Sequence, residues 1–150
     1  MDSNVRREII LENYQDPMNR GLIEDDTYLK VNTNSESCID NLDFQIKIED
    51  NVIKDIRFDG EACAISTSAT SIMIHTLIGK TTEEVKNILK NYQNMIEDKE
   101  YDKDILGELI VYDEINKQPN RIHCALIPSI AVQEILNKLE GNKVEYGENN

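Results

Sequence analysis

The hydrophobic pattern of this chain changes its period at Gly60. Before Gly60, apolar and polar residues alternate over 42–48 and again over 52–58, with Asp50 and Asn51 between the two runs. This alternation is typical of two antiparallel strands joined by a tight turn. After Gly60 the apolar residues recur every three to four positions, which is typical of helices. The pattern predicts an α+β fold, a small antiparallel three-stranded sheet with helices packed on one face.

The other elements follow from the same periodicities. We expect helices over 4–14, 64–78, 85–96 and 103–114, a weaker strand over 27–31, and a last helix that contains 126–139. Thr81 and Glu84 form a capping box before the third of these helices, and Pro128 indicates that the last helix begins near that residue or bends. At 150 residues the chain is expected to be a single domain, 1–150, with a polar tail at 141–150 that frays.

The charge balance of the chain is strongly acidic. It has 29 acidic and 16 basic residues, a formal net charge of −13. Attraction to nucleic-acid backbones or anionic membranes is therefore not expected, and a protein partner should offer a basic surface. The N-terminus lacks the apolar stretch of a signal peptide, and no segment approaches a membrane span. We expect a cytoplasmic protein without a nucleic-acid or membrane partner.

Three cysteines, each with a second feature beside it, are the strongest chemical signal. Cys38 is two residues before Asp40, Cys63 stands where a strand pattern gives way to a helix, and Cys124 follows His123 directly. An odd number of widely spaced cysteines in a reducing compartment argues against a disulfide framework. Thiolate, imidazole and carboxylate groups together can complete a tetrahedral metal site.

The expected positions of these residues on the scaffold bring them within reach of one another. Cys38 and Asp40 should lie on the same side of a segment that enters a strand, because the side-chain period there is two. Unpaired amides at a helix start should favour the thiolate at Cys63, and Cys124 should lie near the start of the last helix in the same setting. His123 and Cys124 diverge as chain neighbours, so we expect them to alternate as ligands.

Two other readings of the same residues have to be weighed. A single cysteine is most often a small buried hydrophobic residue, although three with compatible neighbours are harder to explain by packing. A structural zinc site that folds an interaction module is a second reading, but such sites are usually all Cys and His, and Asp40 weighs against it. A hydrolytic zinc enzyme is disfavoured, because the sequence has no HExxH-type helix and no nucleophile elbow.

Four segments of the sequence resemble the NifU/IscU/SufU iron-sulfur cluster assembly family. They are YQDPMNRG at 14–21, SCID at 37–40, FDGEACAIS at 58–66 and RIHCA at 121–125, and the match runs from about residue 5 to 139. The resemblance implies that Cys38, Asp40, Cys63 and Cys124 hold zinc or a nascent [2Fe-2S] cluster. It also implies that Cys124 accepts persulfide sulfur from a pyridoxal-phosphate cysteine desulfurase.

The resemblance leaves two branches of the family open. An extra segment near 97–119 resembles SufU, a branch linked to zinc-dependent sulfur transfer, whereas His123 stands where IscU-like proteins have a histidine. Residues 118–120 do not resemble the Leu-Pro-Pro-Val-Lys chaperone motif of IscU, so dependence on that chaperone is not expected. Ala62 replaces a glycine of the family pattern, and its Cβ is expected to limit the turn before Cys63.

The sequence thus predicts a scaffold or sulfur acceptor rather than a conventional enzyme. The first hypothesis is an assembly protein that accepts sulfur at Cys124 and transfers a labile [2Fe-2S] cluster to recipient apo iron-sulfur proteins. The second is a zinc-dependent sulfurtransferase that relays sulfur without building the cluster. An oligomer is compatible with either. By resemblance, the N-terminal helix and the turn at 17–21 lie near the desulfurase.

Overall fold

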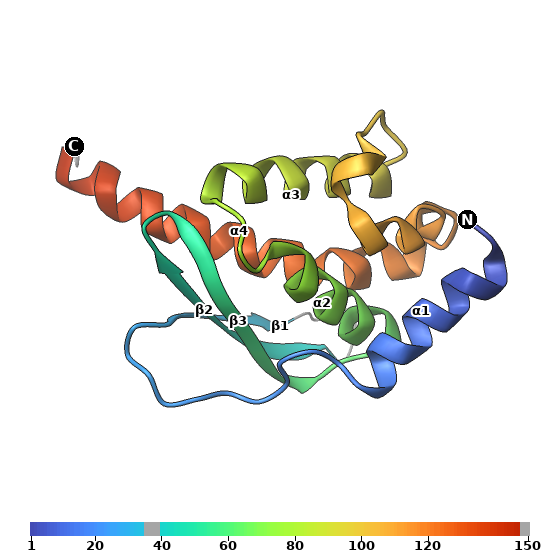
Figure 1. Ribbon diagram of the computed structural model, residues 1–150, viewed down its shortest axis with the longest axis horizontal. Helices are drawn as coiled ribbons and strands as arrows, with labels where there is room; N and C mark the ends of the chain where they lie inside the picture. The colour runs from blue at the N-terminus through green and yellow to red at the C-terminus, as the bar shows by residue number, and fades with distance from the viewer. Residues whose placement is uncertain (35–39, 148–150) are drawn as a thin grey trace.

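The computed structural model describes residues 1–34 and 40–147, with side chains described up to residue 141. Figure 1 shows three strands on one side of the molecule and helices on the other. The elements in chain order are α1 (Ser3–Gln15), β1 (Leu29–Asn34), β2 (Asn41–Glu49), β3 (Val52–Glu61), α2 (Ala64–Leu77), α3 (Thr82–Ile96), the 3₁₀ segments η1 (Lys103–Ile105), η2 (Gly107–Tyr112) and η3 (Ile115–Lys117), and α4 (Pro119–Gly147). The predicted α+β class is confirmed.

The sheet is an antiparallel meander in the order β1-β2-β3. Its predicted hairpin is confirmed: Glu49 pairs with Val52, and Asp50 and Asn51 have φ values of 53° and 61°. Two successive positive φ values are typical of a type I′ turn, which matches the twist of the flanking strands. Strand β1 begins at Leu29, two residues later than the predicted start at Thr27.

The two faces of the sheet are covered differently. One face packs against α2 and α4 (Figure 1), and its buried side chains include Phe44, Ile46 and Phe58. On β2 the buried Gln45 bonds the loop that follows α1: its Oε1 accepts from the Ile23 amide at 2.9 Å, and its Nε2 donates to the Ile23 carbonyl at 2.7 Å. A short loop thus covers a polar position on β2.

Helix α2 lies at the centre of the helical layer and is buried almost all round. Small hydroxyl side chains occupy much of its buried surface, and each has a hydrogen-bonding partner. Examples are the Ser68 hydroxyl, 2.6 Å from the Tyr112 hydroxyl, and the Ser71 hydroxyl, which donates to Asn13 Oδ1 at 2.7 Å. Small residues let neighbouring elements approach the helix closely, so α2 connects α1, η2 and α4.

Two sequence predictions are wrong at this level. The segment 103–114 forms short 3₁₀ helices rather than an α-helix, and Gly107, with a φ of 55°, interrupts it. The last helix begins at Pro119 and continues through Pro128, so the first of the two predicted alternatives, a start near Pro128, is wrong. Proline suits the first turn of a helix because its missing amide is not needed there. The predicted capping box of Thr81 and Glu84 is present on α3.

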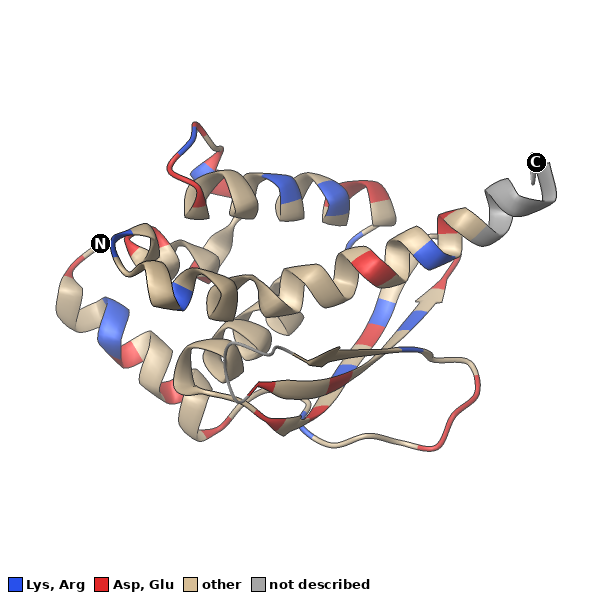
Figure 2. Cartoon of the chain, turned by 180° about the vertical axis from the view of Figure 1, so that it is seen from behind, with Lys and Arg blue, Asp and Glu red and all other residues tan. Residues whose placement is uncertain are grey.

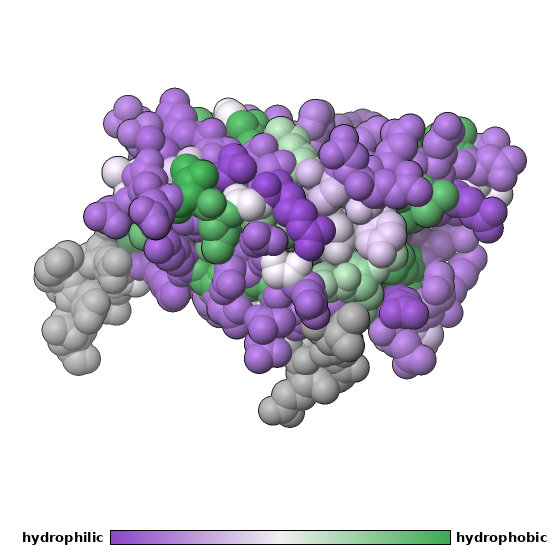
Figure 3. Space-filling view, turned by 90° about the horizontal axis from the view of Figure 1, so that it is seen from below, coloured by the Kyte–Doolittle hydropathy of each residue, from purple (hydrophilic) through white to green (hydrophobic). Residues whose placement is uncertain are grey.

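The surface of the described chain is polar. Figure 2 shows basic residues in the middle of α3, acidic residues toward its ends and both kinds in the loop after it. Figure 3 shows hydrophobic residues only in small separate groups on a mostly hydrophilic face. Within residues 1–34 and 40–147, no helix is both long enough and apolar enough to cross a membrane.

Candidate metal centre

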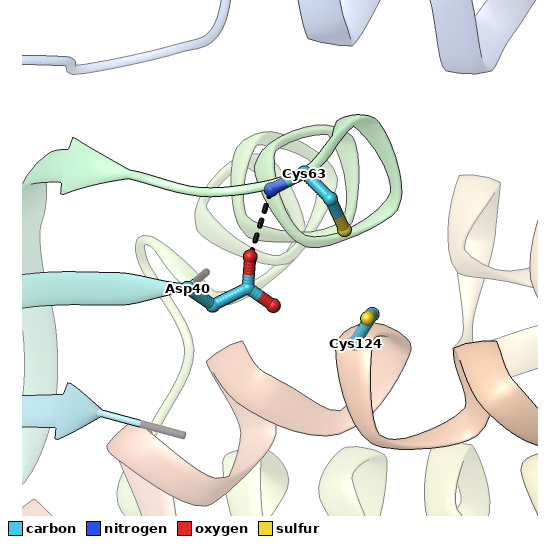
Figure 4. Close-up of side chains that lie close together, drawn as sticks. All are labelled: Asp40, Cys63 and Cys124. Carbon is cyan, nitrogen blue, oxygen red and sulfur yellow. Dashed lines mark hydrogen bonds between the residues drawn. The ribbon is translucent and has the colours of Figure 1, made fainter. Parts of the chain in front are cut away.

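Three side chains from three separate elements converge at one end of the sheet. Asp40 directly precedes β2, Cys63 directly precedes α2, and Cys124 lies in α4 (Figure 4). One carboxylate oxygen of Asp40 and the sulfurs of Cys63 and Cys124 all lie within 4.8 Å of one another. The chain brings these residues together from positions up to 84 apart in sequence, counting from Asp40 to Cys124. Among the described residues, these three form the group with metal-ligand potential.

Cys63 is the N-cap of α2. Its φ and ψ of −69° and 170° are extended, and its sulfur accepts a hydrogen bond from the Ser66 amide at 3.4 Å. The sulfur therefore takes the place that a Ser or Asp oxygen usually has at this position. The predicted location of Cys63 at a helix start agrees with the structure, and the residue is partly exposed.

Asp40 is fully buried, and both of its oxygens receive hydrogen bonds. The Cys63 amide donates to Oδ1 at 2.7 Å, and the Ser66 hydroxyl donates to Oδ2 at 2.7 Å. Burying a carboxylate is costly unless such donors replace the lost water. The carboxylate is thus held in one orientation by α2, next to the two sulfurs.

Gly60 allows the strands to approach closely beside Asp40. A Cβ added at Gly60 would lie 2.2 Å from the carbonyl oxygen of Asn41, and the residue has a φ of 130°. Both observations require glycine. Ala62, where the family pattern has glycine, is not among the described residues with positive φ, so its Cβ is tolerated in this turn.

Cys124 is 1% exposed and lies in the second turn of α4. The sequence predicts a position near the start of the last helix. Because that helix begins at Pro119, Cys124 lies beyond the unpaired amides of the first turn. The helix dipole acts mainly within that first turn, so its effect on Cys124 is smaller than predicted. The next residue is held from α3, since the Tyr92 hydroxyl donates to the Ala125 carbonyl at 2.6 Å.

Of the two other predicted ligands, only His123 lies among the described residues, and it is not part of this group. His123 is exposed and lines a groove of about 210 Å³ beside Asn34 and Glu134 rather than pointing into the three-residue cluster. Its divergence from Cys124 agrees with the expectation for adjacent helical residues. Cys38 lies outside the described residues. A larger cavity of about 660 Å³ lies between α2, α3 and η2 and contains no cysteine, so pocket volume does not mark the site.

Ser66 and Pro128 contribute to this centre and were missed by the sequence analysis. The Ser66 hydroxyl is 3.4 Å from Cys63 Sγ and donates to the Cys124 carbonyl oxygen at 3.1 Å. Pro128 follows Cys124 by four residues in α4. The sequence contains a signal for each residue. Ser66 is three residues after the N-cap, at the capping-box position. Pro128 has no amide proton to donate to the carbonyl of residue 124, four positions earlier in the helix.

A buried tyrosine lies on the η2 side of the same helix. Burial raises the pKa of Tyr112 above the usual range of a phenol, and its hydroxyl pairs with Ser68, two residues beyond Ser66. The phenol therefore stays protonated and packs edge-to-face against Tyr92 at a centroid distance of 6.5 Å. This contact joins η2 to α3 around the centre.

The donor set is suited to zinc or iron. Two thiolates and one carboxylate favour zinc or iron-sulfur chemistry over magnesium or calcium, which prefer oxygen ligands alone. The buried carboxylate is already oriented toward the sulfurs, so the residues present fit such a group. The fold and centre define a small α+β protein in which a carboxylate and two cysteine sulfurs form a candidate metal site.

Comparison with known families identifies the group to which this architecture belongs. Residues 5–145 match the model of the NifU-like N terminal domain, so the chain belongs to the NifU-like N-terminal domain family. A curated relative, the zinc-dependent sulfurtransferase SufU of Bacillus subtilis, is 32% identical over 90% of this chain and 91% of its own length. The iron-sulfur cluster assembly scaffold protein IscU of Thermotoga maritima is 29% identical, over 88% of this chain and 92% of its own.

A solved structure agrees with these relatives. The iron-sulfur cluster assembly scaffold protein described for the SUF system of Fervidobacterium islandicum superposes with a TM-score of 0.77 at 31% identity, covering 84% of this chain and 92% of that one. The predicted resemblance to the NifU/IscU/SufU family is confirmed.

Proposed function

We propose that this protein accepts persulfide sulfur at Cys124 and supports the assembly of a labile [2Fe-2S] cluster. The observation that carries the proposal is the convergence of Asp40, Cys63 and Cys124 within 4.8 Å in a chain of this family. Cys38, two residues before Asp40 in sequence, completes the proposed ligand set by family resemblance. His123 is proposed as an alternate ligand that would have to turn from its present groove.

The proposed sulfur transfer is an exchange between a thiolate and a persulfide. The Cys124 thiolate attacks the outer sulfur of a persulfide on a cysteine desulfurase and forms a new S–S bond. The S–S bond of the donor breaks, and its cysteine leaves as a thiolate, so no oxidant is consumed. Each transferred sulfane sulfur then needs two electrons to become cluster sulfide. For a cluster with two ferric ions built from ferrous iron, the iron supplies one of these electrons per sulfur and an external reductant the other.

The residues of the centre have distinct roles in this proposal. Cys63 is partly exposed and Cys124 is buried, so Cys63 is the more accessible ligand and Cys124 the protected acceptor. A carboxylate oxygen binds cluster iron less strongly than a thiolate does, so Asp40 keeps the assembled cluster labile enough to be transferred. When zinc is bound instead, it would keep the coordinating thiols in their thiolate form. A purely structural zinc site is a weaker explanation, because structural sites are usually closed by Cys and His.

The proposed desulfurase surface is formed by α1 and the turn after it. Helix α1 exposes Val5, Leu11 and Tyr14, each 44–45% accessible, and Leu22 in the following loop is 45% exposed. Apolar residues grouped on one exposed element are typical of interaction surfaces. Recipient apo iron-sulfur proteins are the second proposed class of partner.

The zinc-dependent sulfurtransferase is a second candidate function. The observation that favours it is the position of His123, which lines a groove outside the group of Asp40, Cys63 and Cys124. The histidine that resembles IscU is therefore not among the grouped side chains. In this alternative the protein relays sulfur from Cys124 to other proteins, and the cluster is built elsewhere.

The deciding experiment measures metal content and the ultraviolet-visible spectrum of anaerobically purified protein, before and after incubation with iron, cysteine and a cysteine desulfurase. A [2Fe-2S] spectrum, together with transfer to an apo-ferredoxin, supports the scaffold. Tight zinc that iron does not replace, with faster desulfurase turnover, supports the sulfurtransferase. Absence of both metal and cluster would refute either function.

A further inference from the structure

Ser66 touches all three described members of the metal centre. Its hydroxyl is 2.7 Å from Asp40 Oδ2, 3.4 Å from Cys63 Sγ and 3.1 Å from the Cys124 carbonyl oxygen. Ser66 is fully buried, so these contacts are not shared with bulk water. A single side chain thus connects the start of β2, the start of α2 and the second turn of α4.

The contact with Asp40 has the form of a capping box in which the carboxylate comes from the residue before β2 instead of from α2 itself. On α3 the box is local: the Glu84 side chain accepts from the Thr81 amide, and the Glu84 amide donates to the Thr81 hydroxyl. On α2 the residue three positions after the N-cap is Ser66, too short to reach back. Asp40 fills this gap, accepting from the N-cap amide of Cys63 and from the Ser66 hydroxyl.

The contact with Cys124 depends on Pro128. In a regular α-helix the amide of residue 128 would donate to the carbonyl of residue 124, but proline has no amide proton. The Ser66 hydroxyl approaches this carbonyl instead, at 3.1 Å. Pro128 therefore lets α2 bond to the backbone of the proposed acceptor cysteine, and this link holds α4 against α2 at the centre.

We propose that Ser66 is the positioning residue of this centre, holding the Asp40 carboxylate and the Cys124 backbone in place before a metal ion binds. Its one hydroxyl proton is shared between two acceptors, and the shorter, charge-assisted bond to Asp40 is the stronger. Carboxylates that bind metals are commonly held by such outer partners, and losing one costs about 10–100-fold in affinity. The inference rests on the proposed function in assuming that the centre binds zinc or iron.

The test compares Ser66→Ala with Ser68→Ala and Ser66→Thr. Ser68 is also fully buried on α2, but its hydroxyl pairs with Tyr112 and does not touch the centre. Zinc affinity is measured by competition with a chromophoric chelator. Hydrogen exchange of the Cys63 amide is measured by nuclear magnetic resonance in metal-free protein, because this amide bonds Asp40 directly.

The expected result is specific to the Ser66 hydroxyl. Ser66→Ala should lower zinc affinity at least about tenfold and speed Cys63 amide exchange by a similar factor, while Ser68→Ala and Ser66→Thr stay close to wild type. The proposal is overturned if Ser66→Ala matches wild type, if Ser68→Ala causes the same losses, or if Ser66→Thr fails as badly as Ser66→Ala. If the wild-type chain binds neither zinc nor iron, the proposed function fails, and Cys63 amide exchange alone then decides whether Ser66 positions Asp40.

Discussion

The Cys63 amide donates a 2.7 Å hydrogen bond to Asp40 Oδ1, which ties the start of α2 to the residue before β2. The same two residues are proposed metal ligands. The carboxylate therefore has a role in folding as well as in metal binding, and the two roles can be separated by experiment.

Replacement of Asp40 should lower the stability of the protein and lengthen the lifetime of a bound iron-sulfur cluster. Asp40→Ala removes two hydrogen bonds at the start of α2 and is expected to lower the free energy of unfolding by about 1–2 kcal/mol. A cluster bound by the remaining ligands should persist severalfold longer in a chelator challenge, because the weak oxygen ligand is gone. Asp43→Ala, at an exposed position on β2, is the control. An unchanged cluster lifetime would contradict the role given to Asp40.

Cys124→Ser separates a sulfur acceptor from a structural ligand. The substitution is nearly isosteric, so the free energy of unfolding should fall by less than about 1 kcal/mol, roughly 2–4 °C in Tm. Transfer of labelled persulfide sulfur from a desulfurase should be lost. Mass spectrometry of the trapped persulfide provides the measurement, with Cys63→Ser as the matched variant. Loss of folding before loss of sulfur transfer would favour the structural zinc module.

Removal of metal should leave the fold intact. The described core of buried aliphatic and aromatic side chains between the sheet and the helices is extensive, so chelated protein should keep its circular dichroism spectrum, unlike a zinc finger. Stimulation of the desulfurase should disappear on chelation and return when zinc is added. Full stimulation by metal-free protein would count against the zinc-dependent mechanism.

Gly60→Ala should be among the most damaging conservative changes. The added Cβ would meet the Asn41 carbonyl oxygen at 2.2 Å, and the φ of 130° is unfavourable for alanine. We expect a loss of at least about 3 kcal/mol in the free energy of unfolding, measured by urea denaturation. Gly141→Ala, where an added Cβ meets nothing within 4 Å, is the control and should change stability little.

Tyr28 should make the protein sensitive to alkali. A hydrogen bond to Asp55, with burial, raises the pKa of Tyr28 from 10.0 to about 12. Between these values the unfolded chain binds fewer protons than the folded chain, so the free energy of unfolding falls as pH rises. The stabilisation is complete below pH 10 and is lost as pH approaches 12.

The contribution of Tyr28 can be isolated by substitution. Tyr28→Phe should show a shallower loss of stability over this pH range, measured by chemical denaturation at each pH. Tyr14→Phe, at an exposed position, is the control. An equally steep loss in Tyr28→Phe would assign the alkaline sensitivity to other groups.

Periodicity in the sequence was sufficient to predict the hairpin, α2 and α3. The expected strand entry and helix starts also placed Asp40, Cys63 and Cys124 within reach of one another, as the structure has them. The turn at Asp50 and Asn51 and the capping box at Thr81 are local signals, because the residues that form each of them are close together in the sequence. The segment 103–114 has helical spacing, but its packing around Gly107 and Tyr112 decided its form.

Local signals mark Ser66 and Pro128, but the contacts that give these residues their roles could not be derived from local sequence. Each acts on a residue of another element or another turn, and nothing in local sequence shows that α2 and α4 lie in contact. The sequence pattern at Pro128 predicts a helix start or a bend. In the structure α4 continues through Pro128, and the Ser66 hydroxyl of α2 donates to the Cys124 carbonyl. Such contacts depend on tertiary packing.

The difference in exposure between Cys63 and Cys124 has a kinetic consequence. With 1% of its surface accessible, Cys124 cannot meet a bulky donor until α4 or its surroundings shift. If sulfur acceptance requires this opening, its rate should level off as donor concentration rises, at the frequency with which the cysteine becomes uncovered. The burial of Cys124 would also protect a newly formed persulfide on this residue from reaction with free thiols in solution.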